Sequence, residues 1–216
     1  MPVIIPSILV NNKEAFIGCY TGLKQSVDMI QLDIADGEFA PNKTWGNPQD
    51  IATHTKTKVE LHLMVQNPLA EMKKWSSVDQ IKRVLIHIES LGNLNGATNF
   101  AKEKGWELGL VLNPDTEILR IEPFVEHATV IMFMGVYPGF QGQTFIPNTC
   151  TRVRKAKQHY PDKKISVDGG VNKETIPSLM RSGVDIICPG SAIFGNTKTP
   201  AENVLDLKTY MANISI

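Results

Sequence analysis

The sequence predicts an α/β protein in which residues 1–216 form a single (β/α)8 TIM barrel. Eight apolar strand candidates alternate with helical patterns, the strands are apolar on both faces, and polar residues gather where strands end. Regular alternation of strand and helix is typical of parallel strands joined by right-handed crossovers. Eight such units in 216 residues fit a compact barrel. An open, doubly wound sheet is the structural alternative.

Each expected strand is a short apolar run that ends at a turn signal. The runs are residues 3–9, 29–35, 58–65, 82–89, 107–112, 129–136, 164–168 and 185–188. The helical patterns cover residues 11–23, 50–54, a segment starting at 68, 97–104, 116–125 with an interruption at 123, 147–159, 172–180 and 201–211. Pro68 suits a first helical position, Asn172 suits a cap, and Gly105 and Gly183 end helices.

The composition excludes several classes of protein. Lys plus Arg and Asp plus Glu both number 22, so there is no global attraction to nucleic acid or to an anionic membrane. No apolar run is long enough to span a bilayer, and no basic region precedes the N-terminal apolar residues. The three cysteines have no metal-type spacing and suggest a reducing compartment. We therefore expect a cytoplasmic protein.

The run over residues 29–35 carries polar side chains on one face. Side chains alternate along a strand, so Gln31, Asp33 and Ala35 share a face opposite the isoleucines and leucine. A buried carboxylate without a partner is costly, and its usual partners are a metal, a substrate or an opposite charge. The alternative is an aspartate that caps the turn at Asp36-Gly37.

Other strands end in residues that can cooperate with Asp33. The first strand ends near Ser7, the third carries Glu60, His62 and Met64 on one face, and the seventh ends at Asp168. Barrel enzymes place their chemistry at the carboxyl ends of strands, so these residues are expected to converge. Two carboxylates and an imidazole suit a divalent metal. A core histidine and a turn aspartate are the alternative, and spacing alone leaves both interpretations open.

Glycine-rich stretches follow the sixth, seventh and eighth strands. Glycines let backbone N–H groups approach a phosphate, and barrels commonly bind phosphate after strands seven and eight. Tight turns are the alternative for any single loop, but three successive loops on one rim favour a phosphate cradle. The stretches are 137–143 with Gly139 and Gly142, 168–172 with Gly169 and Gly170, and 189–195 with Gly190 and Ser191.

Together these motifs resemble the ribulose-phosphate 3-epimerase family over nearly the whole chain. The resemblance implies a barrel that binds a ketose phosphate and inverts a hydroxyl-bearing carbon beside the carbonyl. It assigns acid/base and metal roles to Asp33 and Asp168, and a metal role to His62. The matching stretches are 6–9, 33–42, 62–65, 113–114, 134–143, 167–172 and 190–195.

The resemblance also assigns roles to the residues around the reacting carbons of the substrate. Ser7 matches a substrate contact, and Met64 and Met134 match sulfur-bearing residues near the reacting carbons. The remaining substrate-binding positions are the glycines and Ser191 of the three loops. No organic cofactor is implied, and a homo-oligomer, either a dimer or a hexamer, is expected by analogy.

The chain departs from the family pattern at several positions. Gln31 stands where the family usually has histidine, and Ala35 where it usually has methionine. A glutamine oxygen is a poorer ligand than imidazole for zinc-like ions, so binding of Zn, Fe, Mn or Co is expected to be weaker or altered. Gly135, Tyr137 and Gln141 also differ from the usual residues of the loop after strand six.

The expected chemistry is a metal-dependent epimerisation, most simply of D-ribulose 5-phosphate to D-xylulose 5-phosphate. One aspartate removes a proton beside the ketone, a Lewis-acidic metal stabilises the enediolate, and the other aspartate returns a proton to the opposite face. Three alternatives remain: an epimerase for another ketose phosphate, a related decarboxylase, and a non-catalytic phosphate-binding protein. The decarboxylase pattern has lysine where this chain has Ala35, and Gln31 is the main support for the non-catalytic protein.

Overall fold

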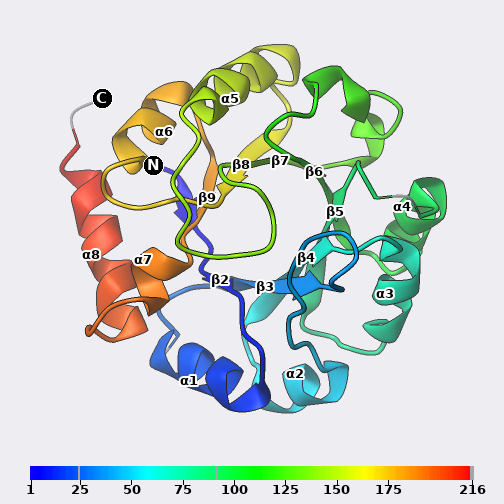
Figure 1. Ribbon diagram of the computed structural model, residues 1–216, viewed down its shortest axis with the longest axis horizontal. Helices are drawn as coiled ribbons and strands as arrows, with labels where there is room; N and C mark the ends of the chain where they lie inside the picture. The colour runs from blue at the N-terminus through cyan, green and yellow to red at the C-terminus, as the bar shows by residue number, and fades with distance from the viewer. Residues whose placement is uncertain (24, 91, 215–216) are drawn as a thin grey trace.

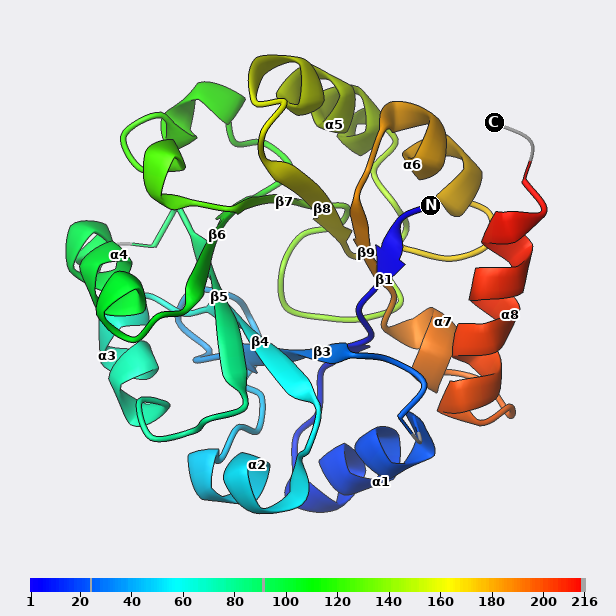
Figure 2. The same ribbon diagram turned by 180° about the vertical axis from the view of Figure 1, so that it is seen from behind.

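The computed structural model describes residues 1–23, 25–90 and 92–214. Its strands form one parallel sheet that curls into a barrel with the helices outside it (Figures 1 and 2). From β3 onward each strand lies beside the preceding strand, which confirms the predicted TIM-barrel fold class. The strands are β1 (Val3–Ile4), β2 (Ser7–Ile8), β3 (Met29–Ala35), β4 (Lys58–Met64), β5 (Ile81–His87), β6 (Glu107–Leu112), β7 (Val130–Met134), β8 (Lys164–Asp168) and β9 (Ile186–Cys188).

The barrel closes through the first apolar run, which is two short strands and not the single strand predicted over residues 3–9. Pro6 has no N–H group to donate, and it separates β1 from β2. β1 pairs with β9, β2 pairs with β3, and the Gln31 N–H donates to the Pro6 carbonyl at 2.9 Å. One continuous segment therefore joins both edges of the sheet, and the open-sheet alternative is excluded.

The helices begin at sequence signals that satisfy their first N–H groups. Side-chain oxygens of Asn47, Asn67 and Thr199 accept backbone N–H groups at the starts of α2, α3 and α8, each of which has proline in its first turn. The helices are α1 (Lys13–Leu23), α2 (Pro48–His54), α3 (Pro68–Lys74), α4 (Leu94–Glu103), α5 (Asn148–His159), α6 (Ile176–Ser182), α7 (Ser191–Phe194) and α8 (Pro200–Ala212). Within the described ranges, none is both long and apolar enough to cross a membrane.

Two local expectations need correction, and one short helix was not predicted. The segment 116–125 contains no α-helix: it forms the 3-10 turns η1 (Ile118–Ile121) and, just beyond it, η2 (Val125–His127), because Pro123 disfavours helical geometry before it and donates no N–H. Asn172 accepts N–H groups of a turn that precedes α6, so it does not cap the helix itself. The short helix α7, which starts immediately after Gly190, was not expected from the sequence.

The strands bury both faces, and the two faces differ in character. On β3, Ile30, Leu32 and Ile34 pack into the main hydrophobic core, whereas Gln31 and Asp33 are buried with polar partners from other strands. A second apolar cluster includes residues of β5, β6, β7 and β9. Polar residues of β3, β4, β5 and β8 are therefore brought together where the predicted site lies.

Candidate metal centre and active site

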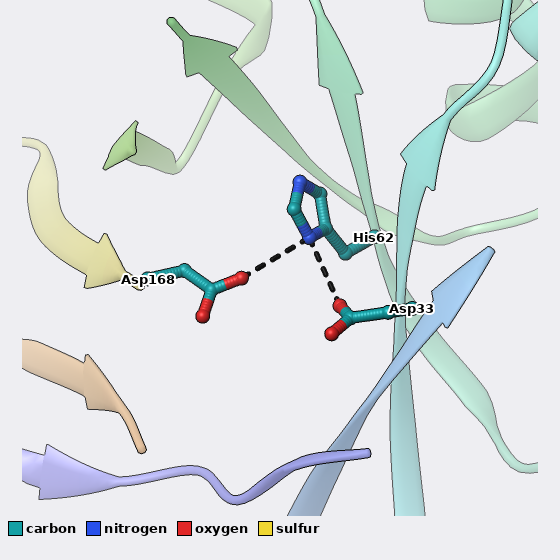
Figure 3. A group of neighbouring side chains, drawn as sticks. All are labelled: Asp33, His62 and Asp168. Atoms are coloured by element: carbon teal, nitrogen blue, oxygen red, sulfur yellow. Dashed lines mark hydrogen bonds and ion pairs between the residues drawn. The ribbon is translucent and has the colours of Figure 1, made fainter. Parts of the chain in front are cut away.

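Two carboxylates and one imidazole converge from three strands. Asp33 on β3, His62 on β4 and Asp168 on β8 point toward one another (Figure 3). His62 Nδ1 lies 3.0 Å from Asp33 Oδ1 and 3.2 Å from Asp168 Oδ2. Asp33 and His62 are directly paired across β3 and β4, so strand register alone places this pair. All three residues are buried, and one potential ligand atom from each lies within 4.8 Å of the other two.

Gln31 lies inside this cluster. Its side-chain nitrogen donates to Asp33 Oδ1 and to Asp168 Oδ2, both at 2.7 Å, and lies 3.3 Å from His62 Nδ1. Its side-chain oxygen is buried and has no hydrogen-bond partner among the described residues. The amide group thus presents N–H groups to the two carboxylates, and its carbonyl must turn inward to act as a metal ligand.

The pocket beside the cluster is bordered by the glycine loops. Ser7 donates its hydroxyl to Asp33 Oδ2 at 2.6 Å, and Met64 and Met134 lie on the pocket wall, 2% and 3% exposed. The structure brings every predicted site residue except Gln31 and His62, which lie deeper, onto this one pocket. Its predicted lining residues are Ser7, Asp33, Met64, Met134, Gly139, Gly142, Asp168, Gly169, Gly170, Gly190 and Ser191.

Steric crowding explains why two of these pocket positions are occupied by glycine. Gly170 has φ +68°, and a Cβ there would lie 2.8 Å from Cβ of Phe145. A Cβ at Gly190 would lie 2.5 Å from the Gln141 side-chain nitrogen and 3.3 Å from the Ser7 carbonyl oxygen. Any larger residue at these positions would push neighbouring groups into the space where the loops meet.

The loop between β7 and α5 crosses the open end of the barrel (Figure 1). Asn42 donates its side-chain N–H to the Gly139 carbonyl at 2.6 Å, and Gln141 donates to the Ser7 carbonyl at 3.2 Å. Tyr137 and Phe140 remain about half exposed on this loop. The loop therefore borders the pocket, and Tyr137 and Phe140 line it while remaining partly open to solvent.

Comparison with known proteins identifies the family. The model of the ribulose-phosphate 3 epimerase family matches residues 3–194. This chain belongs to the ribulose-phosphate 3-epimerase family. The predicted class of enzyme, a ribulose-phosphate 3-epimerase-like isomerase, is thereby confirmed at the level of the family.

Similar members of the ribulose-phosphate 3-epimerase family come from several different organisms. The chain is 36% identical over 188 residues to ribulose-phosphate 3-epimerase of Methanocaldococcus jannaschii, covering 82% of this chain and 78% of that protein. It is 34% identical over 192 residues to the cytoplasmic isoform of Oryza sativa, covering 86% and 83%. For the Aquifex aeolicus enzyme the identity is 32% over 181 residues, covering 80% of each chain.

Solved structures similar to this epimerase-family chain support the barrel fold. KGPDC from Streptococcus mutans superposes with a TM-score of 0.76 at 12% identity, covering 99% of this chain and 98% of that one. A 3-hexulose-6-phosphate synthase superposes with a TM-score of 0.72 at 18% identity, covering 97% and 99%. At these identities the similarity concerns the fold alone.

The electrostatics of the cluster in this family member favour a positive charge at its centre. Burial lowers the pKa of His62, but hydrogen bonds to Asp168 and Asp33 outweigh it and raise the pKa to about 10. Burial and the Asp33 charge raise the pKa of Asp168. Without a metal the imidazole therefore holds a proton between the carboxylates. A bound divalent cation would take the place of that proton.

The residues present fit a divalent metal ion. Asp33, His62 and Asp168 supply two oxygens and one nitrogen from a buried site, the donor number and type of many catalytic metal centres. The unpaired oxygen of Gln31 offers an uncharged additional ligand if the amide turns. Family membership and the geometry of Asp33, His62 and Asp168 thus agree that this cluster could hold a metal ion.

His87, and Arg83 as the partner of Glu60 in a buried ion pair beneath the site, were not expected from the sequence. His87 Nε2 lies 2.9 Å from His62 Nε2, and burial lowers the pKa of His87 to about 4. Two residues before His62 on β4, the Glu60 carboxylate accepts a hydrogen bond from the Arg83 guanidinium at 2.7 Å. The signal was alternation along β5, which places Arg83, Leu85 and His87 on one face with the inward residues of β4.

Proposed function

We propose that this protein is a metal-dependent epimerase that inverts C3 of a ketose phosphate, interconverting D-ribulose 5-phosphate and D-xylulose 5-phosphate. The single observation that carries the proposal is the placement of two buried carboxylates beside a pocket bordered by three glycine loops. Family membership adds the reaction class, because the similar curated proteins are ribulose-phosphate 3-epimerases.

Asp33 and Asp168 are the proposed acid/base pair. They reach the site from β3 and β8, which are separated in the sheet by β1–β2 and β9 on one side, so they approach a substrate from different directions. One removes the proton from C3, and the other returns a proton to the opposite face of the resulting enediolate. Ser7 is bonded to Asp33 and is placed to orient that carboxylate and to contact the substrate.

The proposed metal ligands are Asp33, His62 and Asp168, with Gln31 as a weak additional ligand. When bound, the ion, one of Zn, Fe, Mn or Co, supplies Lewis-acid stabilisation of negative charge on substrate oxygen. The neutral amide of Gln31 supports a site that binds zinc less tightly than a site with imidazole at this position.

The proposed substrate contacts divide between an apolar wall and a phosphate cradle. Met64 and Met134 are buried on the wall and limit water near the reacting carbons. The backbone of the three glycine loops, through Gly139, Gly142, Gly169, Gly170, Gly190 and Ser191, is proposed to hold the phosphate.

The decarboxylase alternative and the non-catalytic alternative have less support. Ala35, which stands where the decarboxylase pattern carries lysine, offers no charge to a substrate. The two carboxylates and His62 remain assembled, so Gln31 is the main feature in favour of a non-catalytic phosphate-binding protein. We propose in addition that the protein is cytoplasmic, binds no nucleic acid and forms a homo-oligomer, which sedimentation analysis would check.

Proton exchange tests the proposed function directly. The parent protein, loaded with zinc, cobalt or manganese, should incorporate solvent deuterium at C3 of ribulose 5-phosphate and form xylulose 5-phosphate, as followed by NMR. Asp33→Asn and Asp168→Asn should each lower turnover by about a hundredfold or more, because positioned proton transfer commonly contributes that much. Asp162→Asn, at a side chain 70% exposed, is the control and should leave turnover unchanged. Near-normal turnover in either site variant, or none in the metal-loaded parent, would reject the assignment.

A further inference from the structure

His87 touches the imidazole of His62 on the side away from the two carboxylates. Figure 3 shows one ring nitrogen of His62 facing Asp33 and Asp168 and the other pointing away. That second nitrogen, Nε2, lies 2.9 Å from His87 Nε2, and both residues are 0% exposed. The two nitrogens share one hydrogen bond, because a donor cannot face a donor and two lone pairs repel.

The arrangement of the two rings supports a head-on hydrogen bond. Their planes differ by 23°, and their centroids are 5.1 Å apart. The centroid separation exceeds the N···N distance by about twice the radius of an imidazole ring. The two nitrogens therefore lie between the ring centres, close to both ring planes, as an N–H···N hydrogen bond requires.

The far side of His87 determines which of the two rings is the donor. His87 Nδ1 lies 3.3 Å from Glu89 Oε2. His87 Nδ1, Glu89 Oε2 and the side-chain oxygen of Asn113 are all buried, and within the described residues none has a hydrogen-bond partner, so the 3.3 Å approach leaves Glu89 Oε2 as the charged acceptor that faces Nδ1. A lone pair on Nδ1 would face a carboxylate, whereas an N–H there satisfies an acceptor. Nδ1 therefore carries the proton, and Nε2 of a neutral His87 is an acceptor.

Glu89 is itself held in one orientation. Its other oxygen, Oε1, accepts the Asn113 backbone N–H at 2.9 Å and the hydroxyl of Thr116. Phe39 covers the His87 ring at a centroid distance of 4.7 Å, which helps to exclude water. The carboxylate thus has one oxygen anchored and the other directed to His87.

We propose that Glu89 and His87 are positioning residues that fix the tautomer of His62. Glu89 holds the proton on Nδ1 of His87, His87 accepts the Nε2 proton of His62, and Nδ1 of His62 is left to face the metal position. Metal-bound histidines commonly donate their other N–H to a carboxylate, a carbonyl or water. In this chain the acceptor of that N–H is a second imidazole, His87, whose own Nδ1 proton is held by the carboxylate of Glu89. The proposal deepens the proposed function, on which its catalytic consequence rests.

Glu89→Gln is the decisive variant. Its carbonyl would keep the Asn113 and Thr116 contacts, so its NH₂ group would face Nδ1 of His87. The proton of His87 would then move to Nε2, so the metal-free imidazolium of His62 would lose its own Nε2 proton, accept there and keep the proton on Nδ1. Zinc affinity should fall about 10–100-fold, the usual loss when an outer partner of a ligand is changed.

The test combines histidine nitrogen NMR with zinc titration. In metal-free parent protein, the spectra should show His87 protonated at Nδ1 only, and in Glu89→Gln at Nε2 only. Glu71→Gln is the matched control, because both glutamate side chains are 15% exposed, and it should change neither the tautomer nor zinc affinity. His87→Gln, which can still accept from His62, should retain zinc affinity, whereas His87→Leu should lose it.

Several results would overturn the proposal. A parent His87 protonated at Nε2 would contradict it, as would an unchanged tautomer in Glu89→Gln. Equal losses of zinc affinity in His87→Gln and His87→Leu would indicate a packing role alone. The tautomer is read without substrate or metal, so these outcomes are distinct from a failure of the proposed epimerase reaction.

Discussion

The buried carboxyl of Glu60 makes a quantitative prediction about stability. Glu60 lies two residues before His62 on β4, is 1% exposed, and accepts from Arg83 at 2.7 Å. Arg83 also donates to Glu107 at 2.6 Å. Burial raises the pKa of Glu60 to about 7, against the opposing charge of Arg83. The perturbation is Glu60→Gln, which keeps an acceptor for Arg83 and removes the titrating group.

The sign follows from proton binding in the two states. Between the ordinary pKa of 4.5 and about 7, the folded protein holds a proton that the unfolded chain has released. The free energy of unfolding of the parent therefore falls as pH rises through this window, and the contribution is complete only below pH 4.5. The difference between the two pKa values corresponds to about 3 kcal/mol. Glu60→Gln has no carboxyl to titrate, so its free energy of unfolding should not fall in this way. As pH rises through the window, the stability of Glu60→Gln relative to the parent should therefore increase by about 3 kcal/mol.

Urea unfolding of metal-stripped protein at several pH values across and above the window measures this difference. Glu107→Gln is the control, because it removes the other carboxylate on the same guanidinium at a side chain 50% exposed. A stability difference between parent and Glu60→Gln that stays constant from pH 4.5 to above 7 would refute the argument. It would mean that the carboxyl titrates alike in the folded and unfolded chains.

Other changes test the metal site, the phosphate cradle and the domain organisation. Gln31→His should raise zinc affinity at least about tenfold, since even an outer partner of a metal ligand is worth that much; Gln80→His is the control, and an unchanged affinity would place residue 31 outside the ligand shell. Crystals soaked in sulfate should show the ion first at the loops of Gly142, Gly170 and Gly190, and density only elsewhere would count against the cradle. That residues 1–216 form one domain stays a prediction, which a single calorimetric unfolding transition would support and two separate transitions would contradict.

Much of the site was predictable from the sequence because it depends on regular geometry. Alternation along β3 placed Gln31 and Asp33 on one face, and the carboxyl ends of parallel strands meet at one rim. Asp33, His62 and Asp168 could therefore be grouped although they lie far apart in the chain, and the structure places them together. The predicted strand over residues 3–9 and the predicted helix over residues 116–125 were wrong in detail, because each contains a proline. Pro6 and Pro123 have no N–H group to donate, so they interrupt the strand and the helix.

The sequence by itself predicted the barrel, with an open sheet as the alternative, the inward faces of β3 and β4, and most of the groups that meet at the mouth of the barrel. Only the tertiary structure decided how those groups bond. It turned the Gln31 amide so that its N–H groups meet both carboxylates, and it placed His87 between His62 and Glu89. Strand periodicity fixes the direction of a side chain, whereas hydrogen-bond partners depend on the stagger of neighbouring strands and on competition among donors and acceptors from distant segments.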